Sequence, residues 1–224
     1  MENRVRIWDL PIRIFHWGLA VLVVFSYVTG RMGGPWLEWH MRSGYAILTL
    51  LLFRIAWGFV GSDTARFSRF LRRPAAAIAY LRDLARGTVR PFVGHNPAGG
   101  WMVIAMLAAV IVQAFAGLFA DDEIATQGPL AVKVSNAWVG TMTRLHDWNQ
   151  WIVLGLVVVH VAAIAIYQWR FHVRLTRAMV AGTVPGLAPG LAPPRLRSSA
   201  LGLAWLAIAA ALVYALVVVY PGLR

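Results

Sequence analysis

The chain has 224 residues, of which 59% are hydrophobic and 13% charged, and its formal net charge is +12. This composition lies outside the soluble globular range and indicates a membrane protein. Cysteine is absent, which excludes disulfides, iron–sulfur ligation, thiolate zinc sites and covalent c-type haem attachment.

Five apolar stretches are each close to the ~20 residues that a helix needs to cross about 30 Å of hydrocarbon. In chain order they are residues 12–31, 39–60, 98–120, 145–168 and 199–220. Helices satisfy every backbone polar group inside lipid, so the predicted fold class is all-α and transmembrane. The first stretch is interpreted as a retained span rather than a cleaved signal peptide, because its apolar run is long and no small-residue cleavage site is evident.

Basic residues set the predicted orientation. Arginines precede the first span, fill the connection between the second and third spans, and follow the fourth, whereas the other connections carry few. By the positive-inside rule the N-terminus is cytoplasmic and the C-terminus lies on the opposite side. These positions favour attraction to anionic lipid headgroups, and no nucleic-acid partner is predicted.

Residues outside the spans carry local signals. Pro74 to Arg86 is predicted to be a short amphipathic helix on the cytoplasmic surface, with Gly87 after its end. Asn96 and Pro97 are predicted to cap and start the third span. Residues 183–198 are rich in Pro and Gly and are predicted to be an irregular cytoplasmic linker.

Four histidines sort into two levels of the membrane. His146 and His160 are fourteen residues apart on one helix, roughly 21 Å along its axis and nearly on the same face. His16 lies near the cytoplasmic end of the first span and His40 near the outer end of the second. His16 therefore shares the cytoplasmic level with His160, and His40 shares the outer level with His146.

Histidine inside a membrane is costly unless it has a role. Bis-histidine haem ligation needs two neutral imidazoles from different helices. The two pairs therefore predict one haem at each level, and the alternative is that individual histidines are hydrogen-bonded structural residues.

Several segments resemble one known family. They are WDLPIRIFHW, EWHMRSGYAILTLLLFRIAWGFVG, GHNPAGGWMV and HVAAIAIYQW. They resemble the bacterial cytochrome b561 and nickel–iron hydrogenase b-type cytochrome family over about residues 4–182. The resemblance implies a four-helix bundle in the bacterial inner membrane that binds two b haems through the four histidines. It also implies electron exchange with quinones or a partner redox protein.

The fifth span departs from the four-span core of that family. The predicted organisation is a diheme domain over residues 1–182, a linker over 183–198 and an additional transmembrane helix within 199–224. Residues 199–220 contain no His, Met or charge, so no redox chemistry is expected there. We expect this helix to pack against a partner subunit or a second copy of the chain, with the linker letting it sit apart. The alternative is packing on its own core.

Further residues near the histidines are candidates for cofactor binding. Gly44 and Gly155 would let a flat porphyrin approach the backbone, or would simply allow close helix packing. Arg13, Arg42 and Arg144 lie two or three residues from predicted ligands. They could pair with haem propionates, or extend to the membrane surface.

Three other residues are kept outside the ligand set. His95 and His172 are predicted to be interfacial, with His95 a minor candidate for a quinone contact. Arg54, within the second span, receives no assignment.

The predicted function is transmembrane electron transfer between the quinone pool and a c-type cytochrome, hydrogenase or dehydrogenase. Three alternatives remain at this point. They are a stand-alone oxidoreductase acting on a small species such as superoxide against quinone, a proton or ion transporter with a histidine relay, and a membrane anchor of a larger redox complex. Self-association of the chain also remains open.

Overall fold

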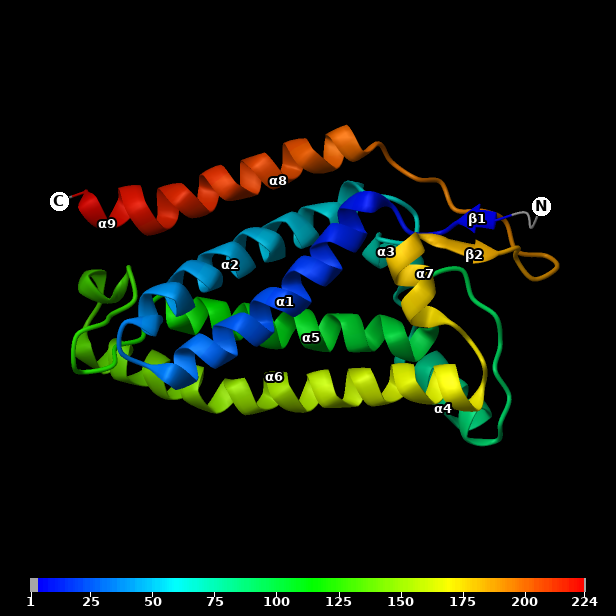
Figure 1. Cartoon of the computed structure of the whole chain (residues 1–224), viewed down its shortest axis with the longest axis horizontal. Helices are drawn as coiled ribbons and strands as arrows, with labels where there is room; N and C mark the ends of the chain where they lie inside the picture. The colour runs from blue at the N-terminus through cyan, green and yellow to red at the C-terminus, as the bar shows by residue number, and fades with distance from the viewer. Residues whose placement is uncertain (1–3, 224) are drawn as a thin grey trace. The chain divides into compact units, whose positions relative to one another are not determined.

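The computed structural model describes residues 4–223, and most of these residues are helical (Figure 1). The long helices are α1 (Leu10–Met32), α2 (Trp36–Val60), α5 (Pro97–Gly117), α6 (Asn136–Arg170) and α8 (Ser199–Tyr214). The shorter elements are β1 (Arg4–Arg6), α3 (Phe67–Phe70), α4 (Pro74–Ala85), the 3-10 turn η1 (Ala131–Lys133), α7 (Leu175–Ala181), β2 (Thr183–Pro185), the π turn η2 (Ala215–Val219) and α9 (Tyr220–Gly222).

Five helical segments of the described chain are long and apolar enough to cross a membrane, the last being Ser199–Gly222. The predicted number of spans is confirmed, and the chain is a multi-pass membrane protein. Large apolar side chains remain uncovered on these helices, such as Val21 at 66% exposure and Val158 at 67%. Exposing this much apolar surface to water is unfavourable, so these helix faces are suited to contact with lipid hydrocarbon.

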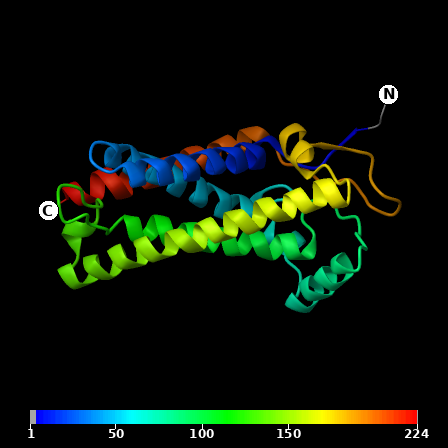
Figure 2. The same ribbon diagram turned by 60° about the horizontal axis from the view of Figure 1, so that its bottom comes forward.

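The helix bounds agree with the predicted ones to within three residues, except at the start of the fourth span. There α6 begins at Asn136 instead of residue 145, after the Ser135 hydroxyl accepts the N–H of Trp138 at 3.3 Å. Its 35 residues make one unbroken helix (Figure 2). At 1.5 Å per residue it is about 52 Å long, more than the hydrocarbon thickness. The prediction, which relied on the apolar run, left out the first turns of α6, because a helix tolerates polar residues where it lies outside the lipid.

The chain divides into two compact units. The first comprises residues 4–14, 55–106 and 156–203, and the second comprises residues 15–54, 107–155 and 204–223. Each long helix contributes residues to both units.

A small sheet in the first unit departs from the all-α expectation. β1 pairs with β2 in antiparallel register, with Val5 opposite Val184 and Arg6 opposite Thr183. Three-residue strands lack a periodic pattern that a sequence could reveal. Their partners are also far apart in the chain, so the pairing is a tertiary feature.

The start of α1 is fixed in the same unit. Asp9, which is 3% exposed, accepts the N–H of Ile12 at 2.7 Å and so caps the helix. Its second carboxylate oxygen accepts the indole N–H of Trp57 at 3.1 Å, and Trp57 is fully buried. One carboxylate thus sets the helix start and joins it to the end of α2.

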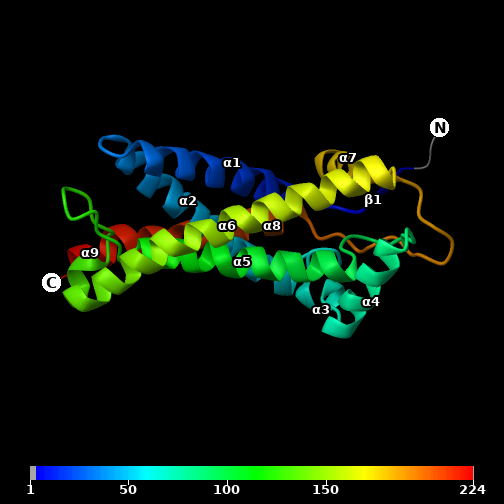
Figure 3. The same ribbon diagram turned by 90° about the horizontal axis from the view of Figure 1, so that it is seen from below.

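The predicted surface helix is present as α4, which follows α3 in the chain and belongs to the first unit (both are labelled in Figure 3). Gly87 follows it with φ +82°, a conformation that glycine adopts readily. The buried Tyr80 hydroxyl hydrogen-bonds to the Tyr167 hydroxyl of α6. This buried contact anchors α4 to a membrane helix.

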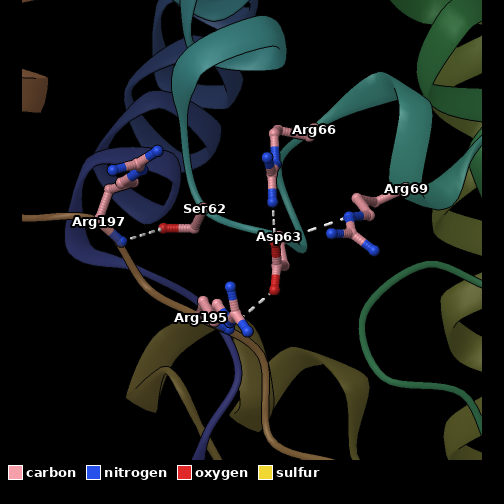
Figure 4. A network of polar contacts seen from close by, with 6 residues as sticks. All are labelled: Ser62, Asp63, Arg66, Arg69, Arg195 and Arg197. Atoms are coloured by element: carbon pink, nitrogen blue, oxygen red, sulfur yellow. Dashed lines mark hydrogen bonds and ion pairs between the residues drawn. The ribbon is translucent and has the colours of Figure 1, made fainter.

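The C-terminal half of the linker is bound to the loop after α2 (Figure 4). The Asp63 N–H donates to the Arg195 carbonyl at 3.0 Å, and the Arg195 N–H donates to the Asp63 carboxylate at 3.0 Å. The Arg197 N–H donates to the Ser62 hydroxyl at 2.9 Å. These three bonds hold the chain in place just before α8 begins.

Both ends of the fifth span contact residues of this chain. A Cβ on Gly202, in the first turn of α8, would lie 2.5 Å from Cγ of Pro11. In the second unit, Lys133 Nζ donates to the Leu223 carbonyl at 2.5 Å. These contacts differ from the expectation that the linker lets the helix sit apart, and they favour the alternative of packing on the core.

Candidate metal centre

Two of the four predicted ligands lie close together in the second unit. His40 comes from the second turn of α2 and His146 from α6, and both are half-buried. Their ring centroids are 5.8 Å apart and their planes are at 89°. Imidazole–metal bonds of about 2 Å would place the centroids of two opposed rings roughly 6 Å apart. The spacing therefore suits one metal ion between the rings.

Backbone carbonyls fix which nitrogen of each ring carries the proton. His40 Nδ1–H donates to the Ser26 carbonyl of α1 at 2.8 Å. His146 Nδ1–H donates to the Gln113 carbonyl of α5 at 2.9 Å. A carbonyl oxygen only accepts, so each neutral ring keeps its lone pair on Nε2. This is the usual outer-shell arrangement around histidine ligands of metals.

A glycine makes room for each of these rings. A Cβ on Gly30 would lie 2.8 Å from Nδ1 of His40, and a Cβ on Gly117 would lie 2.9 Å from Cε1 of His146. Each glycine follows its carbonyl acceptor by four residues, in the segments SYVTG and QAFAG. The same construction thus occurs twice, once between α1 and α2 and once between α5 and α6.

The α5–α6 side has an additional amide network. Gln113 Nε2 donates to the His146 carbonyl at 2.9 Å. Asn149, only 5% exposed, donates from its amide to Gln113 Oε1 at 2.8 Å and to the Ala109 carbonyl at 2.8 Å. These bonds satisfy buried polar groups and hold the two helices in register at the level of His146.

Sequence reasoning missed Ser26, Gly30, Gln113, Gly117 and Asn149. The available signal was a glycine four residues after a polar residue, at the same depth as a predicted ligand on another helix. Which helix would face which histidine could not be read from spacing.

The two glycines that were predicted have a different environment. Nothing lies within 4 Å of a Cβ built on Gly44 or on Gly155. Gly44 follows His40 by one helical turn, so the open space lies along the face of α2 that carries His40. A flat macrocycle would fit such a space, and His40 and His146 would hold its iron through their Nε2 atoms. The residues present therefore fit a haem.

The other two predicted ligands belong to different units. His16 lies in the second unit and His160 in the first, both half-buried. The ring of His16 contacts that of Trp17 edge to face at 4.9 Å. Their pairing remains a prediction.

The three predicted arginines have contacts with the protein itself. Arg13 donates from Nε to the Met179 carbonyl at 3.2 Å and from Nη2 to the Val180 carbonyl at the end of α7. Arg42 pairs with Glu38 at 2.5 Å, and both side chains are about 60% exposed. Arg144 reaches the Thr141 hydroxyl at 3.4 Å. Propionate binding by these arginines remains a prediction.

The residues kept outside the ligand set have distinct surroundings. His95 lies 4.9 Å from the ring of Trp8 and 4.7 Å from that of Phe70 in the first unit. His172 is exposed and follows α6 with φ +56°. Arg54 is 2% exposed and lies 5.9 Å from the Phe15 ring, so it is buried in the protein instead of reaching the membrane surface.

Five membrane-spanning helices and two neighbouring imidazoles, each with its Nδ1–H bonded to a carbonyl, define a membrane protein with a site suited to haem. The sequence profile of the prokaryotic cytochrome b561 family matches residues 7–182, and the chain belongs to this family. It is therefore a b-type cytochrome of membrane electron transport, and haem b is its cofactor.

Several curated proteins are similar to the chain. A probable Ni/Fe-hydrogenase B-type cytochrome subunit of Azotobacter chroococcum mcd 1 is 24% identical, over 71% of this chain and 80% of its own length. A protein of the same description from Cupriavidus necator is 25% identical, over 70% and 77%. A probable Ni/Fe-hydrogenase 1 B-type cytochrome subunit of Escherichia coli K12 is 27% identical, over 69% and 80%.

Proposed function

We propose that this cytochrome binds two b haems and carries electrons across the bacterial inner membrane between the quinone pool and a partner redox protein. The outer haem is held by His40 and His146, and the cytoplasmic-level haem by His16 and His160. The observation that carries the proposal is the pair of imidazoles with centroids 5.8 Å apart, whose Nδ1 atoms are both hydrogen-bonded to carbonyls.

The bound haem supplies one-electron chemistry. The carbonyls of Ser26 and Gln113 hold each imidazole in one orientation and one tautomer, because each accepts a hydrogen bond from Nδ1–H and leaves the lone pair on Nε2. A hydrogen bond of this kind makes the ring a stronger donor to iron. Gly30 and Gly117 let each ring reach that position.

The spacing along α6 supports transfer across the bilayer. His146 and His160 are fourteen residues apart in one unbroken helix, which is roughly 21 Å along its axis. Haems held by these two histidines would lie at two depths of the membrane, and their one-electron chemistry would let an electron pass from one depth to the other. The basic connections support an N-terminus on the cytoplasmic side and a C-terminus on the periplasmic side.

The names of the relatives support one partner among those considered. Because similar chains are described as B-type cytochrome subunits of Ni/Fe hydrogenases, we propose a hydrogenase as the redox partner, ahead of a c-type cytochrome or another dehydrogenase. Quinone is the proposed second partner. Residues 1–182 form the proposed haem domain, with residues 183–198 and 199–224 as the linker and added helix.

A pyridine haemochrome assay of the purified protein tests the proposal, with two b haems expected per chain. His146→Leu should remove the outer haem and His160→Leu the other, leaving complementary spectra. His172→Leu, the control, should keep both. One haem or none in the unaltered protein would contradict the proposal, and so would loss of the same haem in both variants.

A further inference from the structure

A cleft of about 230 Å³ opens in the first unit where two membrane helices begin. Arg6 of β1, Arg13 of α1 and Arg197 of the linker line it together with Ser199, the first residue of α8. Three arginines from three separate segments thus surround one space. The N-terminus of α8 adds the positive end of a helix dipole.

The charge around this cleft is positive after its acidic residue is counted. Asp9 also lines the cleft, but its carboxylate is already bonded to the Ile12 N–H and the Trp57 indole. Three arginines against one aspartate leave a net charge of +2. An anion is the complementary ligand, and a phosphate matches the planar guanidinium.

Two of the arginines are available to a ligand. Arg13 uses two of its N–H groups on carbonyls of α7. Arg6 and Arg197 form no side-chain ion pair or hydrogen bond within residues 4–223, and both are exposed. Figure 4 shows the Arg197 side chain directed away from Asp63, while its backbone N–H is held by Ser62.

The same cleft has apolar walls. Leu10, which is 48% exposed, and Leu196 line it beside the arginines. Leu10 and Ser199 are the first residues of two membrane-crossing helices, so the cleft lies where these helices enter the bilayer. Trp8 also lines the cleft, and tryptophan favours this interfacial depth. A ligand with both a phosphate and an acyl chain fits such a site.

We propose that this cleft binds the headgroup phosphate of an anionic phospholipid in the cytoplasmic leaflet. Leu196, Arg197 and Ser199 lie outside the residues that match the family, 7–182, so the C-terminal extension completes the site. The hydrogen bonds of Asp63 and Ser62 to the linker hold Arg197 at the cleft. The proposal does not depend on the number of haems.

Native mass spectrometry of the delipidated, haem-loaded full-length protein with added phosphatidylglycerol tests the proposal. Arg197→Gln and Arg6→Gln should each weaken lipid binding by about five-fold, and the double variant by about 25-fold. Arg195→Gln is the matched control. It removes the same charge only two residues before Arg197, but the Arg195 side chain does not line the cleft. It should change binding by less than about two-fold.

Two further variants separate charge from shape. Arg197→Lys keeps the charge and should retain most of the binding. Ser199→Phe keeps the charge but fills the cleft, and it should weaken binding as strongly as Arg197→Gln. Ser199 is exposed and Ser198 caps α8 through the Leu201 N–H, so this variant should fold.

The source of the phosphate is distinguished by competition. Inorganic phosphate at millimolar concentration should not displace phosphatidylglycerol, and phosphatidylcholine should bind more weakly. Displacement by inorganic phosphate would overturn the lipid assignment. Equal losses in Arg195→Gln and Arg197→Gln would overturn the site, and loss of a haem in Arg197→Gln would show that the cleft serves a propionate instead.

Discussion

The two compact units use polar groups in different places. In the second unit these groups lie inside membrane helices and act on histidines, as Gln113 and Asn149 do. In the first unit, polar groups also join loops that are far apart in the chain, as Asp63 and Arg195 do across 132 residues of sequence. Ligand geometry therefore depends on contacts between neighbouring helices, whereas the linker before α8 is held by contacts over long sequence distances. Changes to the helix contacts around His40 and His146 should therefore affect haem binding, whereas changes to the long-range contacts around Asp63 should affect stability alone.

The largest expected effect is the loss of haem affinity on replacing Gly117, the glycine that supports His146. Gly117→Ala places a methyl group 2.9 Å from the imidazole and should displace the ring. The fold should survive, because the obstacle is the end of a side chain. Disturbing the support of a metal ligand costs roughly 10- to 100-fold in affinity. Titration of the apoprotein with haemin should show this loss at one site only.

Gly140→Ala serves as the control for this effect. A Cβ on Gly140, also in α6, would make only ordinary contact, 3.7 Å from the Arg144 guanidinium. Haem affinity should be unchanged there. Equal weakening in both variants would show that the glycine contact does not position the ligand.

The second prediction compares the stability contributed by polar side chains on the α5–α6 side of the outer site with that contributed on the α1–α2 side. Asn149→Leu leaves the buried Gln113 Oε1 and the Ala109 carbonyl without their donor, which should destabilise the protein by about 1–3 kcal/mol. Ser26→Ala removes a hydroxyl 3.2 Å from His40 Nδ1 but keeps the carbonyl that accepts its proton. It should cost less than about 1 kcal/mol. Thermal unfolding in detergent measures both, and a larger loss for Ser26→Ala would reverse the comparison.

A third prediction concerns the fifth span in the first unit. Gly202→Leu collides with Pro11, a rigid ring 2.5 Å from the added Cβ, and should destabilise the protein by about 1–3 kcal/mol. Ala204→Leu, at an exposed position of the same helix, should have little effect. Thermal unfolding distinguishes the two. Equal melting temperatures for the two variants would show that the helix does not pack on the core.

The smallest effect is expected at Asp63, and it depends on pH. The Arg195 N–H and then the Arg66 guanidinium hold the pKa of Asp63 below its ordinary value. The pKa of an unfolded aspartate is about 3.9. The stabilisation is therefore fully present above that pH, and it is lost as the pH falls through the lower pKa of Asp63 in the folded protein. The ion pairs lie at the surface, so Asp63→Asn should cost no more than about 1 kcal/mol near neutral pH.

Unfolding at two pH values checks this prediction. The stability of Asp63→Asn and of the unaltered protein should differ at about pH 6 and approach each other at about pH 3. Glu38→Gln is the control, since its pair with Arg42 is exposed on both sides and should contribute little. A constant difference at both pH values would contradict the role of the Asp63 charge.

Much of the architecture follows from the sequence because lipid imposes strict local rules. A span must be apolar over the hydrocarbon thickness, so helices such as α2 and α5 were predictable to within three residues. The order of the spans and the place of each histidine within its span assigned His40 and His146 to one depth, and their rings do lie together. Local capping rules also placed the start of α5, where Asn96 accepts the N–H of Gly99 at 2.7 Å.

Tertiary structure alone decided how those predicted residues are supported. Gly30 and Gly117 matter only because particular imidazoles lie against them, and helix-to-helix facing leaves no mark in a single sequence. The pairing of β1 with β2 and the cleft at Arg6 and Arg197 likewise join residues that are far apart in the chain. The length and apolar character of each run specify which segments enter the membrane. Side-chain contacts between them, which depend on three-dimensional packing, decide what each segment holds.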